Sequence, residues 1–193
     1  MTEYWKVVWE SFKNGSVSSF KLIYHEYIDL LYAYGSKITS DEEILKDSVQ
    51  QLFLELYTSG KNLSNPGNLK YYLLKALKII IIHEIKKRYK YTSFELVDSI
   101  KFELELDVES EVIETEEKSA KIKFLQKTLS DLPPEKRELL FLKFYSGFNN
   151  EEIGGALGLK AETVKKRIYR ILKQLHIQFR DLPIILFSLY YKI

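Results

Sequence analysis

The sequence contains no cysteine, only three histidines and only four prolines. Without cysteine, the chain can form neither a disulfide framework nor a thiolate metal site. The histidines, His25, His83 and His176, have no metal-ligand spacing, so we expect no metal and no other cofactor. There is also no glycine-rich phosphate loop, and the acidic residues suggest no catalytic pair. These absences argue against an enzyme.

Long hydrophobic runs are also missing. No stretch of about 18 apolar residues occurs, so we expect no membrane span. The first five residues lack a basic segment followed by an apolar core, so we expect no signal peptide and a cytoplasmic protein. With 46% hydrophobic and 29% charged residues over 193 positions, the chain has the composition of one ordinary soluble domain or two small ones.

The charge is strongly segregated, although the net charge is only +2. Residues 92–118 carry ten acidic and two basic residues, whereas residues 70–91 carry seven basic and one acidic residue. Residues 119–180 carry thirteen basic and six acidic residues. Two basic blocks therefore flank an acidic one, and clustered cations of this kind are typical of proteins that bind nucleic-acid phosphates.

Apolar residues recur at spacings of three and four along most of the chain, which predicts helices. Two are expected between Phe20 and Tyr34, capped by Ser18 or Ser19, and between Ile44 and Leu56. The turn at 65–67 precedes further expected helices over 69–90, 115–132, 135–145, 150–157 and 161–176. We predict an all-α fold of two small helical bundles, 1–91 and 119–177. A flexible acidic linker, 92–118, joins them, and an apolar tail, 178–193, follows.

Residues 150–167 have the pattern of a helix-turn-helix. Gly154 is small where two helices approach closely, and Gly158 allows the positive φ of a sharp turn. Asn149 can cap the first helix, with Glu152 completing a capping box. The shared core is expected to consist of Ile153, Leu157, Leu159, Val164 and Ile168.

The second helix of this motif has a mostly cationic polar face, as a helix in a DNA major groove requires. The DNA-binding candidates are Lys160, Glu162, Thr163, Lys165, Lys166, Arg167 and Arg170. Lys160 is a poor residue where a helix cap is needed. The alternative interpretation is a plain helical hairpin with a solvated basic face.

Several of these segments resemble sigma factors of bacterial RNA polymerase. Residues 132–137, 141–145, 151–153 and 163–167 resemble region 4 of that family, and residues 47–57 resemble region 2.2. Residues 68–75 and 86–88 resemble the helix that engages the −10 promoter element. Their order, and the absence of recognisable domains one and three, resemble the extracytoplasmic-function (ECF) type.

The resemblance implies a non-enzymatic protein that binds core RNA polymerase through its β′ clamp and β flap. It further implies recognition of promoter DNA at the −10 and −35 elements, and a possible anti-sigma factor as partner. The −10 candidates are Lys70, Tyr71, Tyr72, Lys75, Lys78, Lys86, Lys87 and Arg88. The clamp-binding candidates are Asp47, Gln50, Gln51 and Glu55. Ile79 and His83 stand where the family usually has Asn and Asp.

Each of these assignments has a simpler alternative. The alternative for Tyr71 and Tyr72 is a place in the core of the bundle, and for residues 47–55 an ordinary solvated helix face. The acidic linker is either a spacer or a screen that folds back on the basic bundles, and the tail either packs on a bundle or binds an anti-sigma factor. For the whole chain, the rivals are a helix-turn-helix regulator with an N-terminal dimerisation or ligand-binding bundle, and a helical scaffold.

Overall fold

The computed structural model describes residues 2–89, 102–104 and 116–178. All regular structure in these residues is helical, which confirms the predicted all-α fold. The chain divides into two compact units, Met1–Lys101 (unit 1) and Phe102–Ile193 (unit 2). Most of the expected linker and nearly all of the expected tail lie outside the described residues.

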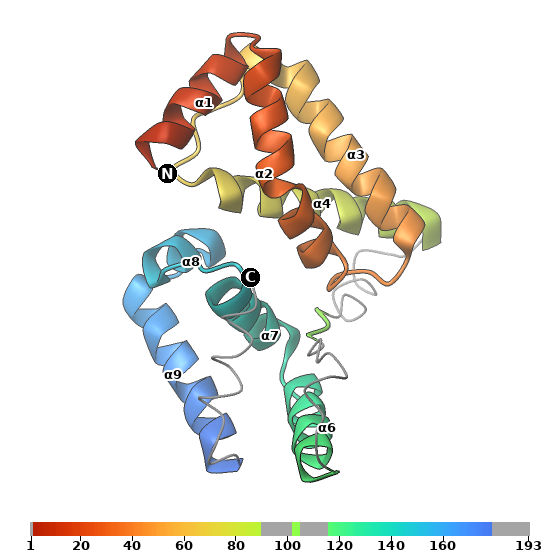
Figure 1. The fold of residues 1–193 in the computed structure, drawn as a ribbon, viewed down its shortest axis with the longest axis vertical. Coiled ribbons are helices and arrows are strands. Elements are labelled where there is room, and N and C mark those ends of the chain that lie inside the picture. Colours follow the sequence, from red (N-terminus) through yellow and green to blue (C-terminus); the bar gives the residue numbers. More distant parts are fainter. Residues whose placement is uncertain (1, 90–101, 105–115, 179–193) are drawn as a thin grey trace. The chain divides into compact units, whose positions relative to one another are not determined.

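Unit 1 is built around one long helix. Its elements are α1 (Glu3–Lys13), α2 (Val17–Gly35), α3 (Glu42–Ser59), the 3₁₀ turn η1 (Gly60–Asn62) and α4 (Leu69–Tyr89). Both α2 and α3 pack on α4 (Figure 1). The buried stripe of α4 consists of Leu69, Leu73, Leu74, Leu77 and Ile81. The opposite face of α4 is therefore free to carry charge.

Helix α1 was not predicted, although its apolar residues have helical spacing. It buries Val8, Trp9 and Phe12, and the Trp9 side chain is fully enclosed. The indole Nε1 of Trp9 donates to the Ser64 carbonyl at 3.2 Å, and Lys13 Nζ donates to Asn65 Oδ1 at 2.8 Å. As Figure 1 shows, the segment between α3 and α4 runs along α1. Helix α1 thus fixes the chain that leads into α4.

The N-terminal cap of α2 is not the residue that was predicted. The cap is Ser16, whose hydroxyl accepts from the Ser19 N–H at 3.2 Å. The prediction of Ser18 or Ser19 was wrong because the chain is already helical there: Gly15, at φ 95°, turns it into α2 three residues earlier. Helix α3 is capped by Asp41, which accepts from the backbone N–H groups of Glu43 and Ile44.

Unit 2 contains α6 (Glu116–Ser130), α7 (Pro134–Leu140), the π-helical turn η3 (Phe141–Tyr145), α8 (Asn150–Leu157) and α9 (Ala161–Gln178). Pro134 occupies the first position of α7, as expected. The single helix predicted over 135–145 instead widens at Phe141, whose carbonyl accepts from the Ser146 N–H at 3.0 Å. Gly147, at φ 67°, ends it.

Phe102 is packed, although it lies in the segment that was expected to be a flexible linker. Its ring is 3% exposed and lies edge-on against the Phe141 ring, with centroids 5.6 Å apart. Burial of an aromatic ring is a large favourable term, which explains why this position packs on unit 2 despite the acidic residues around it.

An ion-pair cluster joins the C-terminal end of α4 to the N-terminal end of α3. Arg88 contacts Asp41 at 2.9 Å and also pairs with Glu43. The pKa of Asp41 lies below its ordinary value of 3.8, chiefly because the Ile44 N–H bonds to its carboxylate, with the Arg88 charge adding to the effect. A carboxyl group whose pKa is lower in the folded state stabilises the fold at pH values above its pKa in the unfolded state. This contribution is lost as the pH falls through the pKa of the folded state.

We therefore predict that Asp41→Asn lowers the melting temperature at pH 7 and flattens its decline below about pH 4. Asparagine keeps the capping oxygen and removes only the charge. Glu42→Gln is the matched control, because Glu42 has only an exposed pair with Lys46, which contributes little. Parallel acid profiles for wild type and Asp41→Asn in thermal melts would contradict the prediction.

Candidate nucleic-acid interface

The helix-turn-helix predicted at 150–167 is present, as α8 and α9. Asn149 Oδ1 accepts from the Glu152 N–H at 2.8 Å, and the Glu152 carboxylate accepts from the Asn149 N–H at 2.9 Å. This reciprocal pair is the expected capping box. Gly158, at φ 65°, lies in the left-handed region, as the sharp turn required.

Gly154 is indispensable to the turn for a specific reason. The Leu159 N–H donates to the Gly154 carbonyl at 2.8 Å, and a Cβ at Gly154 would lie 2.6 Å from the Leu159 carbonyl oxygen. The close neighbour is thus the backbone of the turn, which cannot rotate away as a side chain would. In the core beside it, Ile153, Val164 and Ile168 are buried, while Leu157 and Leu159 are only half-buried.

The outer face of α9 exposes most of the predicted DNA-binding residues. Glu162, Lys165, Lys166, Arg167 and Arg170 are exposed, and Thr163 is half-buried. Lys160 is exposed just before α9, where its carbonyl accepts from the Thr163 N–H. Lys166 Nζ lies 3.7 Å from Glu162 Oε1. These side chains form one continuous cationic surface.

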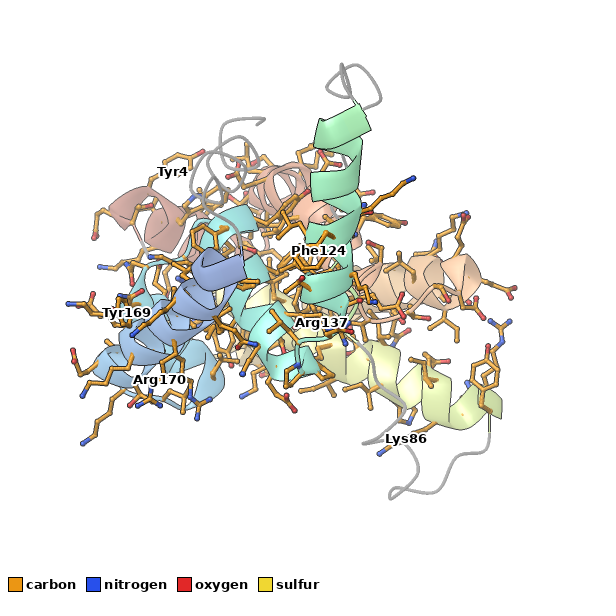
Figure 2. The ribbon with its side chains drawn as sticks, turned by 90° about the horizontal axis from the view of Figure 1, so that it is seen from below. Tyr4, Lys86, Phe124, Arg137, Tyr169 and Arg170 are labelled. Carbon is orange, nitrogen blue, oxygen red and sulfur yellow. The ribbon has the colours of Figure 1, made fainter. Side chains whose placement is uncertain are left out.

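Sequence reasoning missed two residues of this surface. Tyr169 is 64% exposed and Lys173 is also exposed. Figure 2 shows Tyr169 and Arg170 extending outward from α9. The signal was available, because Tyr169 and Lys173 lie four and eight positions after Lys165 and so share its side of the helix.

In unit 1, α4 presents a second cationic surface opposite its buried stripe. Lys75 is exposed, and Lys78 and Lys86 are half-buried; Lys86 is labelled in Figure 2. Ile79, which is 59% exposed, lies in the middle of this surface. We call Lys75, Lys78, Ile79 and Lys86 the cationic face of α4.

The remaining candidates on the first two turns of α4 are partly buried. The Tyr72 ring lies edge-on to the Trp9 ring, with centroids 5.8 Å apart, and burial raises the pKa of its hydroxyl. Tyr72 therefore packs within unit 1, in line with the simpler alternative. Tyr71 and Lys70 are half-buried as well, and the Tyr71 N–H donates to Asn68 Oδ1 at 2.9 Å.

The basic run at 86–88 is split among three sides of α4, because successive helical residues are rotated by about 100°. Only Lys86 belongs to the cationic face. Arg88 is eleven residues, about three turns, after Leu77 and so turns toward α3, where it pairs with Asp41 and Glu43. Lys87 lies in a groove with residues of α3. The structure therefore does not bring Lys87 and Arg88 together with the cationic face.

This groove between α3 and α4 contains three of the four clamp-binding candidates. Its lining residues are Asp47, Gln50, Gln51, Leu54, Glu84 and Lys87. The fourth candidate, Glu55, is exposed and accepts from Gln51 Nε2 at 2.8 Å. Leu54, which sequence reasoning missed as a site residue, is 57% exposed. The groove thus combines an exposed apolar side chain with amide and charged groups.

Two features are absent from residues 2–89, 102–104 and 116–178. These residues contain no group of three histidine, aspartate or glutamate side chains placed to hold a metal ion. None of the helices within the described ranges is long and apolar enough to cross a membrane.

Known proteins resemble both parts of the chain. Residues 125–175 match the family model described as sigma-70, region 4. The chain is 25% identical over 160 residues to the ECF RNA polymerase sigma factor SigE of Mycolicibacterium smegmatis, covering 83% of this chain and 61% of that relative. It is 26% identical over 147 residues to the RNA polymerase sigma factor SigV of Bacillus subtilis, covering 76% and 82% respectively. The chain is thus similar to sigma factors, and over 83% of its length to one of the ECF type.

A solved structure shares the fold of this chain. The sigma factor RpoE of Bartonella quintana, crystallised in complex with the anti-sigma factor NepR, superposes with a TM-score of 0.57. The alignment covers 85% of this chain and 98% of RpoE at 21% identity. The match to SigE, in contrast, spans only 61% of that longer relative.

Proposed function

We propose that this chain is a sigma factor that binds core RNA polymerase and directs it to promoters. In this proposal α9 recognises the −35 element and α4 the −10 element. The observation that carries the proposal is a pair of cationic helical faces, one in each unit. The face on α9 belongs to a helix-turn-helix whose first helix, α8, has a complete capping box. The protein itself does no bond chemistry, and it acts in the cytoplasm.

On α9 the charges and the polar residues have different tasks. Lys165, Lys166, Arg167 and Arg170 neutralise phosphates, which supplies affinity without sequence information. Glu162 and Thr163, in the first turn of α9, approach base edges in the major groove, where each base pair presents a distinct pattern of donors and acceptors. The cationic face of α4 holds the backbone of the −10 region in the same way.

The groove between α3 and α4 is the proposed docking site for the β′ clamp, and unit 2 the site for the β flap. Leu54 supplies the apolar contact, with Gln50 and Gln51 as hydrogen-bonding neighbours. Lys87 is reassigned from DNA to this interface, because it lines the groove and lies 4.0 Å from Glu84. By likeness to RpoE, an anti-sigma factor is a further proposed partner.

The decisive experiment mixes the purified full-length chain with core RNA polymerase and assays run-off transcription from a library of promoter fragments. We expect initiation at a defined class of promoters only when both components are present. A helix-turn-helix regulator would bind DNA but would not convert the core enzyme into a promoter-specific holoenzyme. Absence of core binding in the same preparation would refute the proposal.

We also predict that Lys166→Ala and Arg170→Ala each reduce the salt dependence of DNA binding by the full chain. The slope of log K against log [salt] is expected to become shallower by about 1 for each lost phosphate contact. Lys6→Ala is the matched control, because Lys6 is an exposed lysine of α1 paired with Glu3. An unchanged slope in both α9 variants, measured by fluorescence anisotropy, would contradict the assignment of α9.

A further inference from the structure

Ile79 is a β-branched apolar residue on the exposed side of α4. It is 59% exposed, whereas its neighbour Ile81 is fully buried and contributes to the core. A β-branched side chain on an exposed helix surface is unfavourable compared with alanine, lysine or glutamine. Ile79 is one of several exposed apolar residues, and its place among the lysines of the cationic face of α4 makes it a candidate for contact with a ligand that those lysines attract.

The surroundings of Ile79 indicate the chemistry of that contact. Lys75 precedes it by one turn and His83 follows it by one turn, and both are exposed. Lys78 and Lys86 complete the cationic face, and this charge attracts a nucleic-acid backbone and brings the attached bases within reach. The Ile79 side chain has no donor or acceptor, so it can distinguish bases only by their apolar surface.

Among the DNA bases, thymine offers such a surface in its 5-methyl group, and apolar side chains commonly contact it. We propose that Ile79 packs on the 5-methyl group of one thymine in the −10 region and thereby selects thymine at that position. This inference rests on the proposed function, and adds to it the chemical feature recognised and the residue that recognises it.

A protein partner at Ile79 is less consistent with the arrangement of charges. The groove that has the mixed character of a protein interface is lined by Glu84 and Lys87, not by Ile79. Helical rotation places Ile79 about 80° from Lys87 and about 140° from Glu84. The contact at Ile79 is thus distinct from the proposed clamp interface.

The test uses holoenzyme assembled from core polymerase and the full chain. Each thymine of the −10 region is replaced singly by deoxyuridine, which removes only the 5-methyl group. With wild-type protein we expect one position at which this replacement weakens promoter binding about fourfold, the value for one methyl group removed from water. With Ile79→Asn the two templates should bind equally at that position, whereas Ile79→Val should retain the discrimination.

Lys75→Ala is the matched control, because losing a phosphate contact weakens both templates equally and leaves their ratio unchanged. The proposal is overturned if no position discriminates in the wild type, or if Ile79→Asn keeps the wild-type ratio. It is also overturned if Ile79→Asn lowers core affinity while leaving the ratio unchanged, which would indicate a protein contact. Failure of the wild-type holoenzyme to initiate on any template would instead refute the proposed function.

Discussion

Replacing Gly154 with alanine is expected to disrupt the helix-turn-helix and with it DNA binding by α9. The new Cβ would lie 2.6 Å from the Leu159 carbonyl oxygen and 3.3 Å from the Ala161 nitrogen, and both atoms are backbone. Relief requires α8 and the start of α9 to separate, which lengthens the 2.8 Å hydrogen bond from the Leu159 N–H to the Gly154 carbonyl.

The expected cost is about 3 kcal/mol, at the upper end of the range for overpacked cores, because the opposing atoms cannot adopt another rotamer. For a unit of this size, such a loss lowers the melting temperature of unit 2 by roughly 10–20 °C. Circular dichroism melts of the full chain and DNA binding at fixed salt measure the two effects. A variant with wild-type melting and DNA binding would show that the turn relaxes freely.

The neighbouring position gives a matched control. Gly155 is exposed and helical, and a Cβ there would meet nothing within 4 Å. Gly155→Ala should therefore be tolerated and should raise the stability of unit 2 by up to about 1 kcal/mol through helix propensity. If Gly154→Ala lowers the stability of unit 2 and Gly155→Ala raises it, the loss at Gly154 is due to the close backbone contact and not to helix propensity.

Much of the fold could be predicted because its signals are local. The helical spacing of apolar residues predicted the bounds of α4, α8 and α9 to within about two residues. The capping box at Asn149 and Glu152 could be predicted from the spacing of these two residues alone. The widening of the helix at Phe141 depends on hydrogen bonding within the folded unit and has no local sequence signal. Helix α1 was missed even though Trp9 and Phe12 have the right spacing.

The candidate site was predicted less completely, because composition does not say to which side of a helix each charge turns. The basic run at 86–88 suggested one surface, but Arg88 is occupied by Asp41 and Glu43 and Lys87 lies in the groove. Exposure of apolar residues was equally inaccessible from the sequence. Leu54 and Tyr169 look like core residues by type, and only the packed structure shows that both are more than half exposed.

The second large effect is expected for Leu54→Glu. Leu54 lies in the groove with Asp47 and Glu84, so the substitution removes the apolar contact and adds a third carboxylate. Losing a central apolar anchor of an interface typically costs 2 kcal/mol or more, which weakens binding to core RNA polymerase about 30-fold or more. Because the side chain is 57% exposed in the free protein, the melting temperature should hardly change.

Leu22→Glu isolates the contribution of the groove. Leu22 is 46% exposed on α2 and does not line the groove, so the same substitution there changes the charge equally without touching the proposed interface. Core binding by Leu22→Glu should match the wild type, and DNA binding through α9 should be intact in both variants. Equal loss of core affinity in both variants would mean that net charge, not the groove, governs the interaction. Selective loss in Leu54→Glu would assign the groove to the polymerase, because an exposed apolar side chain lies there among amide and charged groups contributed by two helices.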